Sequence, residues 1–88
     1  MPELSRFFGI IVRMYFVDAN QHHTPHIHVE SNGKTASVSL DGRVLAGQID
    51  KRKLTVLQAW MLLHEEELKA AWQSLLNAEP FGTIEPLR

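Results

Sequence analysis

Two histidines one residue apart, His26 and His28 in the segment PHIHVE, are the side chains of this sequence best suited to chemistry. On a β-strand, residues i and i+2 point to the same side, with Cα atoms roughly 6.6 Å apart. Two imidazoles at that spacing can exchange protons with a substrate near neutral pH, or can share a metal or a small anion. A structural alternative stands beside these, in which both rings are bonded to serines of a neighbouring strand.

A metal site would need more ligands than this pair. Zinc, nickel and iron all accept imidazole nitrogen, so a divalent metal such as zinc or nickel is the cofactor to consider. The chain has no cysteine, which excludes thiolate ligands. A third ligand would have to come from Asp18, His22 or His23 in the preceding loop, from another element, or from a second subunit. On their own, His22 and His23 are typical of a solvated loop pair.

A further histidine, His64, interrupts an apolar helical pattern near the middle of the C-terminal half. A histidine in that position is usually a core residue bonded to a backbone carbonyl. It becomes a third catalytic histidine, beside His26 and His28, only if the helix reaches the same side of the sheet. The expected strand register opposes this, because Ile27 and Val29 are then the residues that face the helix. The conflict would dissolve if the helix were broken and wrapped round an edge of the sheet.

Two groups of residues are candidates for binding a phosphate or another part of a substrate. Arg13 and Tyr15 belong to an N-terminal strand that we expect near the histidines. The run Lys51, Arg52 and Lys53 stands at a predicted helix start, where free backbone N–H groups point outward and favour anions. The alternative for this run is a solvated first turn of the helix.

An antiparallel sheet is expected to position the two histidines. Residues 8–16 alternate between apolar and mixed positions, which predicts a strand with one face in the core. The dipeptide Asn32-Gly33 between two alternating runs is a strong hairpin signal. A two-residue turn there sets His28 opposite Ser37 and His26 opposite Ser39, and leaves the intervening apolar residues to the core. We call the side that carries these histidines and serines the histidine face.

A second turn signal, Asp41-Gly42, predicts a further strand over residues 43–49, with Leu45 and Ile49 facing inward. Apolar residues are also expected on the histidine face, and such a mixed surface calls for a cover. These residues are Phe7, Ile11, Tyr15, Val44 and Ala46. The cover could be the tail at 83–87, a second copy of the chain in a homodimer, or a small partner protein.

The period then changes to that of a helix, which begins after Asp50 as the expected N-cap. Its apolar stripe is formed by Leu54, Leu57, Met61, His64, Leu68, Trp72 and Leu75. A straight helix of this extent would be about 37 Å long, which exceeds the sheet, so the helix either extends past the sheet or bends or breaks near His64 and Glu65. The sequence thus predicts one α+β domain over 1–88: an antiparallel meander of about four strands with one long C-terminal helix, either continuous or broken, on one face.

The bulk properties fit a small cytoplasmic protein with no membrane segment. The chain has 88 residues, a formal net charge of −1 and no signal-peptide pattern. A net charge this close to zero argues against strong nonspecific binding to nucleic acid, although it is compatible with a local basic patch.

Four segments in order, MPELSRFFGIIVRMYF, PHIHVE, LLHEEELKAAW and IEPL, resemble a small bacterial family, domain of unknown function 4160. The matching motif positions are Met1-Pro2, Ser5-Arg6-Phe7, Gly9, Pro25-His26-Ile27-His28, Leu63-His64, Glu67-Leu68 and Trp72. The loop before Pro25 departs from the family pattern, so no role carries over to His22 or His23. The resemblance implies no specific chemistry, but it does imply a toxin–antitoxin-like gene pair, and hence a partner protein and an RNA-directed activity.

Three functional readings follow from these observations. In the first, His26, His28 and His64 act as acid/base or phosphate-binding groups on RNA, within a toxin–antitoxin-like pair. In the second, His26 and His28 are metal ligands. In the third, the protein is not a catalyst and its histidine face binds a protein partner.

Overall fold

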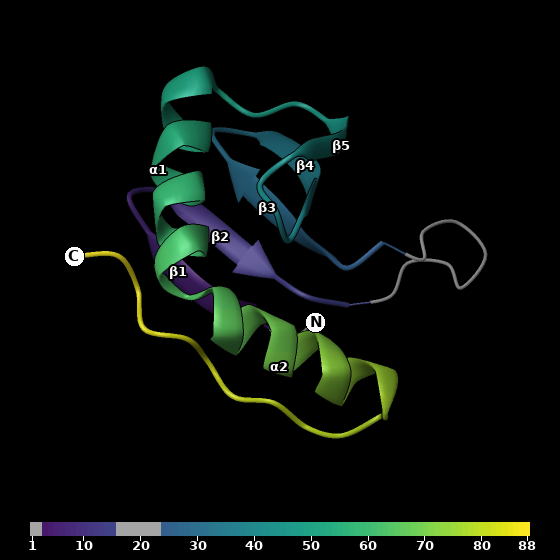
Figure 1. The fold of residues 1–88 in the computed structure, drawn as a ribbon. Coiled ribbons are helices and arrows are strands. Elements are labelled where there is room, and N and C mark those ends of the chain that lie inside the picture. Colours follow the sequence, from purple (N-terminus) through teal and green to yellow (C-terminus); the bar gives the residue numbers. More distant parts are fainter. Residues whose placement is uncertain (1–2, 16–23) are drawn as a thin grey trace.

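Five successive strands form one antiparallel sheet in the computed structural model, which describes residues 3–15 and 24–88 (Figure 1). The strands follow one another in space in the order in which they occur in the chain. The elements are β1 (Glu3–Phe7), β2 (Ile10–Arg13), β3 (His26–Ser31), β4 (Lys34–Ser39), β5 (Val44–Gly47), α1 (Lys51–Leu63) and α2 (Glu65–Leu76). The predicted α+β meander is therefore confirmed, with a fifth strand and a second helix that the sequence pattern did not separate.

The first strand of the prediction is in fact two strands. Phe8 and Gly9 both have positive φ, 50° and 74°, and form the turn of a hairpin between β1 and β2. Phe7 consequently lies opposite Ile10, on the core side, where its ring centroid is 5.1 Å from that of Trp60. The expectation of Phe7 on the histidine face was wrong, because the hairpin resets the alternation.

The central hairpin has the predicted register. Asn32 and Gly33, both at positive φ, connect β3 to β4 and set His28 opposite Ser37 and His26 opposite Ser39. The residues between them in the two strands are buried under the helices. These are Ile27, Val29, Ala36 and Val38. The two-residue turn therefore decides which side of each strand reaches the core.

Strand β5 pairs with β4 through an irregularity between Ser37 and Val38. Ala46 lies opposite Ser37 and so faces the histidine side, as predicted. Val44 lies opposite Val38, so its expected place on the histidine face was wrong. The cause is the register shift, which changes the alternation within this short strand.

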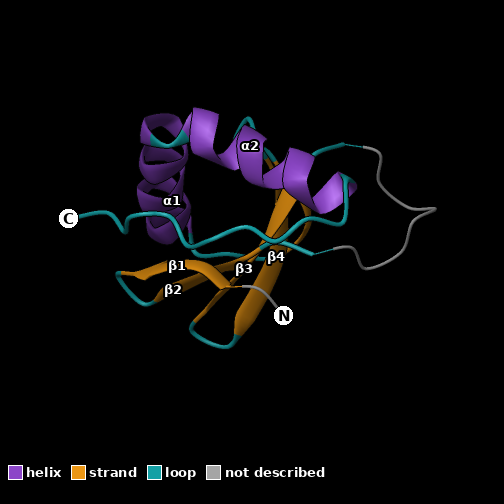
Figure 2. Ribbon diagram, turned by 90° about the horizontal axis from the view of Figure 1, so that it is seen from below, coloured by secondary structure: helices purple, strands orange, loops and turns teal. Residues whose placement is uncertain are grey.

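The helices lie together on one face of the sheet and cross at a large angle (Figure 2). The helix is broken, which is one of the two forms that the sequence left open: α1 ends at Leu63, α2 begins at Glu65, and His64 between them has φ −117° and ψ 27°. Each helix contributes buried side chains to the core. These are Leu57, Trp60 and Met61 from α1, and Leu68, Ala71 and Trp72 from α2. Neither helix has the length and apolar character that a membrane crossing requires.

The C-terminal tail returns along the helix side of the molecule (Figure 1). The backbone N–H of Ile84 donates to the carbonyl of Leu4 at 2.7 Å, and the Trp60 indole N–H donates to the carbonyl of Glu85 at 2.8 Å. These bonds hold the tail against β1 and α1. The tail was one of three expected covers for the histidine face, and its described contacts place it elsewhere.

Candidate functional site

The side of the sheet away from the helices carries a hollow of about 350 Å³. Strands β2, β3, β4 and β5 contribute to it, together with Tyr15, which lies two positions after the end of β2. Its lining comprises Arg13, Tyr15, His28, Val29, Glu30, Thr35, Ala36, Ser37, Ala46 and Gly47. The strand alternation explains this set, because the polar side chains are those that the register turns away from the core. The hollow is therefore the central part of the histidine face.

His28 lies in this hollow between groups from two other segments. Its ring stacks on that of Tyr15, with centroids 4.1 Å apart and an interplanar angle of 16°. Its Nδ1 is 3.4 Å from the hydroxyl oxygen of Ser37, the residue directly opposite on β4. The Tyr15 ring thus covers one face of the imidazole, and the Ser37 hydroxyl lies at its edge. Such a setting suits a proton transfer group or a stacking platform.

Arg13 stands beside His28 on the neighbouring strand, because the β2–β3 register pairs these two residues. Its guanidinium nitrogen is 3.0 Å from a carboxylate oxygen of Glu30, and both side chains are partly exposed. Glu30 was not among the candidate residues of the sequence. The β2–β3 pairing, which places Glu30 opposite Ile11 and next to Arg13, was the missing information. An arginine has five N–H donors, so this ion pair leaves capacity for an anion.

His26 lies behind His28 and is almost fully buried, at 3% exposure. Its Nδ1 donates to the carbonyl of Thr24 at 2.8 Å, which places the proton of the neutral ring on Nδ1. The two histidine rings meet edge to face at 5.0 Å, and His26 also lies 5.3 Å from the ring of Trp72 on α2. The pair shares one side of the strand, as the spacing predicted. Only His28, however, lines the hollow.

The hydroxyl that was expected beside His26 serves the next turn instead. Ser39 donates to the carboxylate of Asp41, and accepts a hydrogen bond from the backbone N–H of Arg43 at 3.2 Å. The bonds from Ser39 and from the Arg43 backbone hold the pKa of the Asp41 carboxyl below its usual value. This network fixes the β4–β5 turn.

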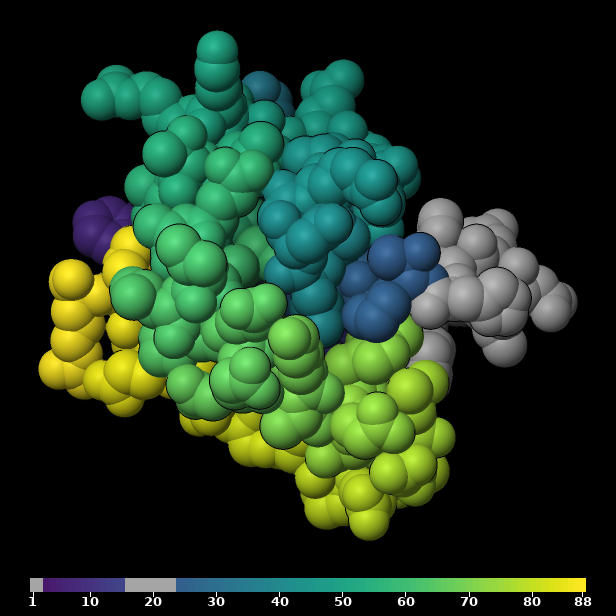
Figure 3. All heavy atoms as spheres, in the orientation of Figure 1, coloured from purple at the N-terminus to yellow at the C-terminus, as the bar shows by residue number. Residues whose placement is uncertain are grey.

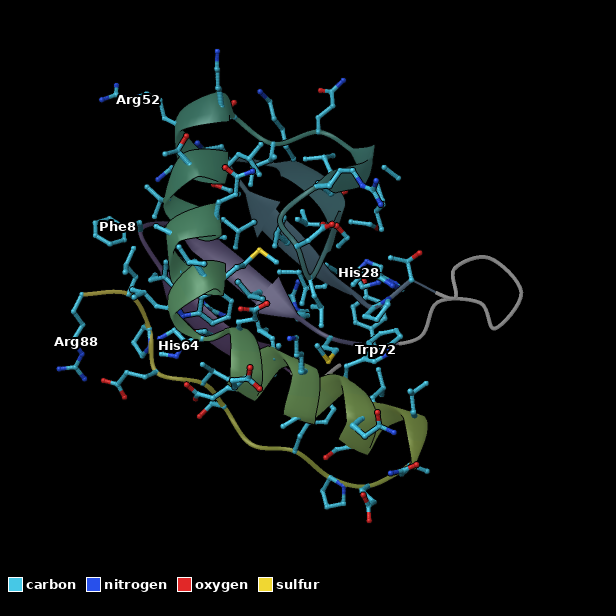
Figure 4. All side chains as sticks on the ribbon, viewed as in Figure 1. Phe8, His28, Arg52, His64, Trp72 and Arg88 are labelled. Carbon is cyan, nitrogen blue, oxygen red and sulfur yellow. The ribbon has the colours of Figure 1, made fainter. Side chains whose placement is uncertain are left out.

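His64 is placed at the helix break, on the opposite layer of the molecule from His28 (Figure 4). Its Nδ1 is 2.6 Å from a carboxylate oxygen of Glu67, and its ring lies 5.5 Å from that of Trp60. The three histidines that the sequence offered as one catalytic set are therefore not brought together. The bond expected for a core histidine is made to Glu67 rather than to a backbone carbonyl.

The basic run at the start of α1 is also separate from the hollow. Arg52 points away from His28 at the far end of the molecule (Figure 4), and Lys51 is likewise exposed. Lys53 folds back and donates to the carbonyl of Phe8 in the β1–β2 turn. The two groups of proposed substrate-binding residues hence belong to two different surfaces, and only Arg13 and Tyr15 share a surface with His28.

Metal binding by His26 and His28 stays a prediction. Among residues 3–15 and 24–88, no three histidine, aspartate or glutamate side chains are placed to hold a metal ion together. The loop candidates Asp18, His22 and His23 lie outside the described residues. Further ligands would have to come from that loop or from a second molecule.

Comparison with known proteins places the chain in a family. The pattern of the family Domain of unknown function (DUF4160) matches residues 9–73, which cover most of the chain, including the hollow, both β3 histidines and the helix break. No curated protein and no solved structure matches the chain. The resemblance of the segments around Gly9, His26, His64 and Trp72 is thus confirmed by a match over most of the sequence. The chain belongs to the family Domain of unknown function (DUF4160).

Proposed function

We propose that the protein binds a single strand of RNA on its histidine face, as the RNA-directed member of a toxin–antitoxin-like pair. The observation that supports this most is the grouping of Tyr15, His28 and Arg13 in one hollow on the side of the sheet away from the helices. Unpaired bases stack on aromatic side chains and arginine planes, and sheet surfaces with such residues are a common platform for single-stranded RNA.

Each of the three side chains has a distinct task in this proposal. Tyr15 already stacks on His28 on one side, so a base on its other side would extend the stack. Arg13 would exchange its carboxylate partner Glu30 for a phosphate, for which a guanidinium has matching geometry. Glu30, once released, could accept a hydrogen bond from an exocyclic amine or a ribose hydroxyl. Glu30 therefore competes with phosphate for Arg13, and a phosphate must displace the Glu30 carboxylate in order to bind.

The charge of the site sets the expected strength of binding. The chain has a net charge of −1, and the arginine of the hollow is already paired. With one or two phosphate contacts, the logarithm of the association constant should fall with the logarithm of salt concentration with a slope of only about −1. We expect weak binding that is dominated by stacking, rather than a tight electrostatic grip.

His28 is the residue of the hollow suited to acid/base catalysis on the bound strand. A histidine can take the proton of a ribose 2′-hydroxyl as the 2′ oxygen forms a bond to the adjacent phosphorus. The bond between phosphorus and the 5′ oxygen then breaks, which leaves a 2′,3′-cyclic phosphate, and the imidazolium gives the proton to the departing 5′ oxygen. Nε2 is buried, so Nδ1, which lies beside the Ser37 hydroxyl, is the atom that would exchange the proton. His26 acts as a positioning residue in this arrangement, because its buried ring lies against that of His28.

Binding is tested by fluorescence anisotropy of labelled single-stranded RNA with single variants of the full chain. Tyr15→Ala and Arg13→Ala should each weaken binding by about tenfold, since stacking contributes roughly 1–3 kcal/mol per base. The matched control is Arg52→Ala, which removes the same cation from the start of α1 and should leave the affinity unchanged. Loss of binding with Arg52→Ala but not with Arg13→Ala would move the RNA to the basic run and contradict the proposal.

Catalysis is separated from binding by His28→Phe. A phenyl ring preserves an aromatic partner for Tyr15 but cannot transfer a proton, so RNA binding should persist while any cleavage by the wild-type protein is abolished. Cleavage that continues at the wild-type rate in His28→Phe would remove His28 from the chemistry and leave only the binding role.

A further inference from the structure

Glu30 is the acidic residue among those that line the hollow, and its carboxylate is only half engaged. Its Oε1 lies 3.0 Å from the Arg13 guanidinium, whereas Oε2 has no hydrogen-bond partner among the described residues. The side chain is 44% exposed, so it is accessible to a ligand in the hollow. A second carboxylate, Glu3, lies opposite Arg13 on β1 but pairs with Arg6 at 2.8 Å. Glu30 is therefore the carboxylate that an anionic ligand of Arg13 must replace.

The surroundings of Glu30 leave room for a base beside its carboxylate. Thr35 lies directly opposite Glu30 on β4, and Gly47 of β5 lines the same hollow. Both residues are small, so little side-chain volume stands above the sheet at this point. His28, two residues earlier on β3, points to the same side and carries the stacked ring of Tyr15. A base beside Glu30 would thus adjoin the aromatic platform on which the neighbouring base of the strand stacks.

The displaced carboxylate determines which base can bind there. When a backbone phosphate takes Arg13, Glu30 loses its ion-pair partner and stands close to the negative charge of the strand. An ionised carboxylate only accepts hydrogen bonds, so it is stabilised when two donors meet its two oxygens. A base that offers two adjacent donors compensates for the lost ion pair, whereas a base that offers an acceptor adds repulsion.

Guanine is the base of RNA whose Watson–Crick edge has this pattern. Its ring N1–H and its exocyclic N2 amine are adjacent donors, and together they can meet both oxygens of one carboxylate. Adenine and cytosine each place one amine beside an acceptor nitrogen, and uracil places one N–H between two carbonyl oxygens. Guanine can therefore replace the guanidinium by two parallel hydrogen bonds, and the other three bases cannot.

We propose that the hollow selects guanine and that Glu30 is the residue that reads it. This inference rests on the proposed RNA binding and names the base that the site takes. In the free protein, Arg13 and Glu30 neutralise one another. In the complex, phosphate takes the arginine and the guanine edge takes the carboxylate, so neither charge is left without a partner. The selectivity arises because every other base leaves the displaced carboxylate short of donors.

Fluorescence anisotropy tests this selectivity with short labelled oligouridines that carry one central guanosine, inosine or adenosine. The wild-type chain should bind the guanosine oligonucleotide at least about tenfold more tightly than the adenosine one, as expected for a good bidentate contact. Inosine keeps N1–H but lacks the N2 amine, so its affinity should lie between the two. Equal affinity for all three overturns the guanine assignment but leaves the proposed RNA binding intact, whereas a failure to bind any of them contradicts both.

Glu30→Gln tests which residue reads the base. The amide keeps the size of the side chain but has one acceptor oxygen, so the affinity for the guanosine oligonucleotide should fall about tenfold. The affinity for the adenosine oligonucleotide should stay the same or rise, because phosphate then meets Arg13 without a competing carboxylate. A disturbed fold would weaken both affinities and could not produce this result. A variant that keeps the wild-type preference for guanosine, whatever its overall affinity, overturns the proposal.

The matched control is Glu85→Gln, the same change at another carboxylate that is paired with an arginine. Glu85 lies 2.7 Å from Arg88, and both side chains are more than half exposed. The tail that carries them runs along the helix side of the molecule (Figure 3, yellow), whereas the hollow lies on the side of the sheet away from the helices. Glu85→Gln should keep the preference for guanosine. If it abolishes the preference as Glu30→Gln does, net charge rather than contact with the base is the cause, and the assignment to Glu30 fails.

Discussion

The sheet layer and the helix layer each hold a partly buried histidine beside an aromatic ring, but they assemble these surroundings differently. His28 on β3 obtains its neighbours from other segments: Tyr15 after β2 and Ser37 on β4. His64 obtains its neighbours within one turn on either side: Trp60 before it and Glu67 after it. The first arrangement exists only when three segments are in register, whereas the second depends on local helical geometry. The surroundings of His28 therefore depend on the correct assembly of the whole sheet, whereas those of His64 do not.

The largest expected effect comes from the helix side of this comparison. Trp60 is fully buried, contacts Phe7, and holds the tail through Glu85. Trp60→Ala should lower the free energy of unfolding by about 3–5 kcal/mol, because it leaves a large cavity and an unpaired carbonyl. Urea denaturation measures this loss, and a value below about 1 kcal/mol would contradict the described core.

The matched control lies two residues further along the same helix. Leu62→Ala removes an apolar side chain that is 76% exposed and should change the stability of the monomer by less than about 0.5 kcal/mol. Trp60→Phe, which keeps an aromatic ring but not the indole N–H, gives an intermediate loss if the alanine variant does not fold. Among the folded molecules of either Trp60 variant, the Tyr15–His28 stack should persist, because Tyr15 and Ser37, which contact His28, belong to the sheet layer.

A smaller effect is expected on the sheet side, at Gly47. This residue has φ +82°, and a Cβ atom there would overlap the carbonyl oxygen of Thr35. That carbonyl accepts the N–H of Gln48 at 2.9 Å, and Thr35 is one of the residues that line the hollow. Gly47→Ala should therefore destabilise the protein by about 2–3 kcal/mol, through both backbone strain and steric overlap.

Gly33 separates these two causes. It has a similar φ, +76°, but an added Cβ atom would meet no atom within 4 Å. Gly33→Ala should cost only the strain of a positive φ, about 1 kcal/mol. Equal losses in thermal or urea unfolding for the two variants would show that crowding at Thr35 is unimportant. The RNA affinity should fall only with Gly47→Ala, since Gly47 lines the hollow.

The comparison also explains how much of the structure the sequence could predict. The β3–β4 register followed from Asn32-Gly33 and alternation, whereas the length of the apolar stripe made a helix break near His64 one of two alternatives. The β1–β2 hairpin was missed because its turn uses Phe8 at positive φ, a conformation that bulky residues rarely adopt. The sequence thus predicted a hairpin where the turn has residues that commonly adopt positive φ, as at Asn32-Gly33, and missed it where the turn contains Phe8.

The site was only partly predictable for a related reason. The shared side of His26 and His28 followed from strand geometry, but their different burial depends on where α2 runs after the break. That path brings Trp72 against His26 and leaves His28 in the hollow. Nothing in the local pattern sets the direction of a helix after a break. The pairing of Arg13 with Glu30 required, in the same way, the position of β2 beside β3.

The smallest expected effect concerns Asp50, which joins the two layers. It occupies the N-cap position of α1, where the sequence predicted it, but its side chain makes no capping bond. Its carboxylate instead accepts hydrogen bonds from Lys34 and Asn32 at the β3–β4 turn. The bond from Lys34, followed by that from Asn32, lowers the pKa of Asp50 below its ordinary value. The interaction therefore stabilises the fold only while the carboxylate is ionised.

The sign of the resulting pH dependence follows directly. Because the folded pKa is below the unfolded value of about 3.9, the contribution is complete above that pH and disappears as the pH falls through the folded pKa. Asp50→Asn should consequently lose less stability than the wild type between pH 7 and pH 3 in urea unfolding. Glu79→Gln, at an exposed carboxylate without an ion pair to a described residue, should keep the wild-type pH dependence. If Asp50→Asn and the wild type have parallel acid limbs, the contact between the central hairpin and the start of α1 does not contribute to stability in solution.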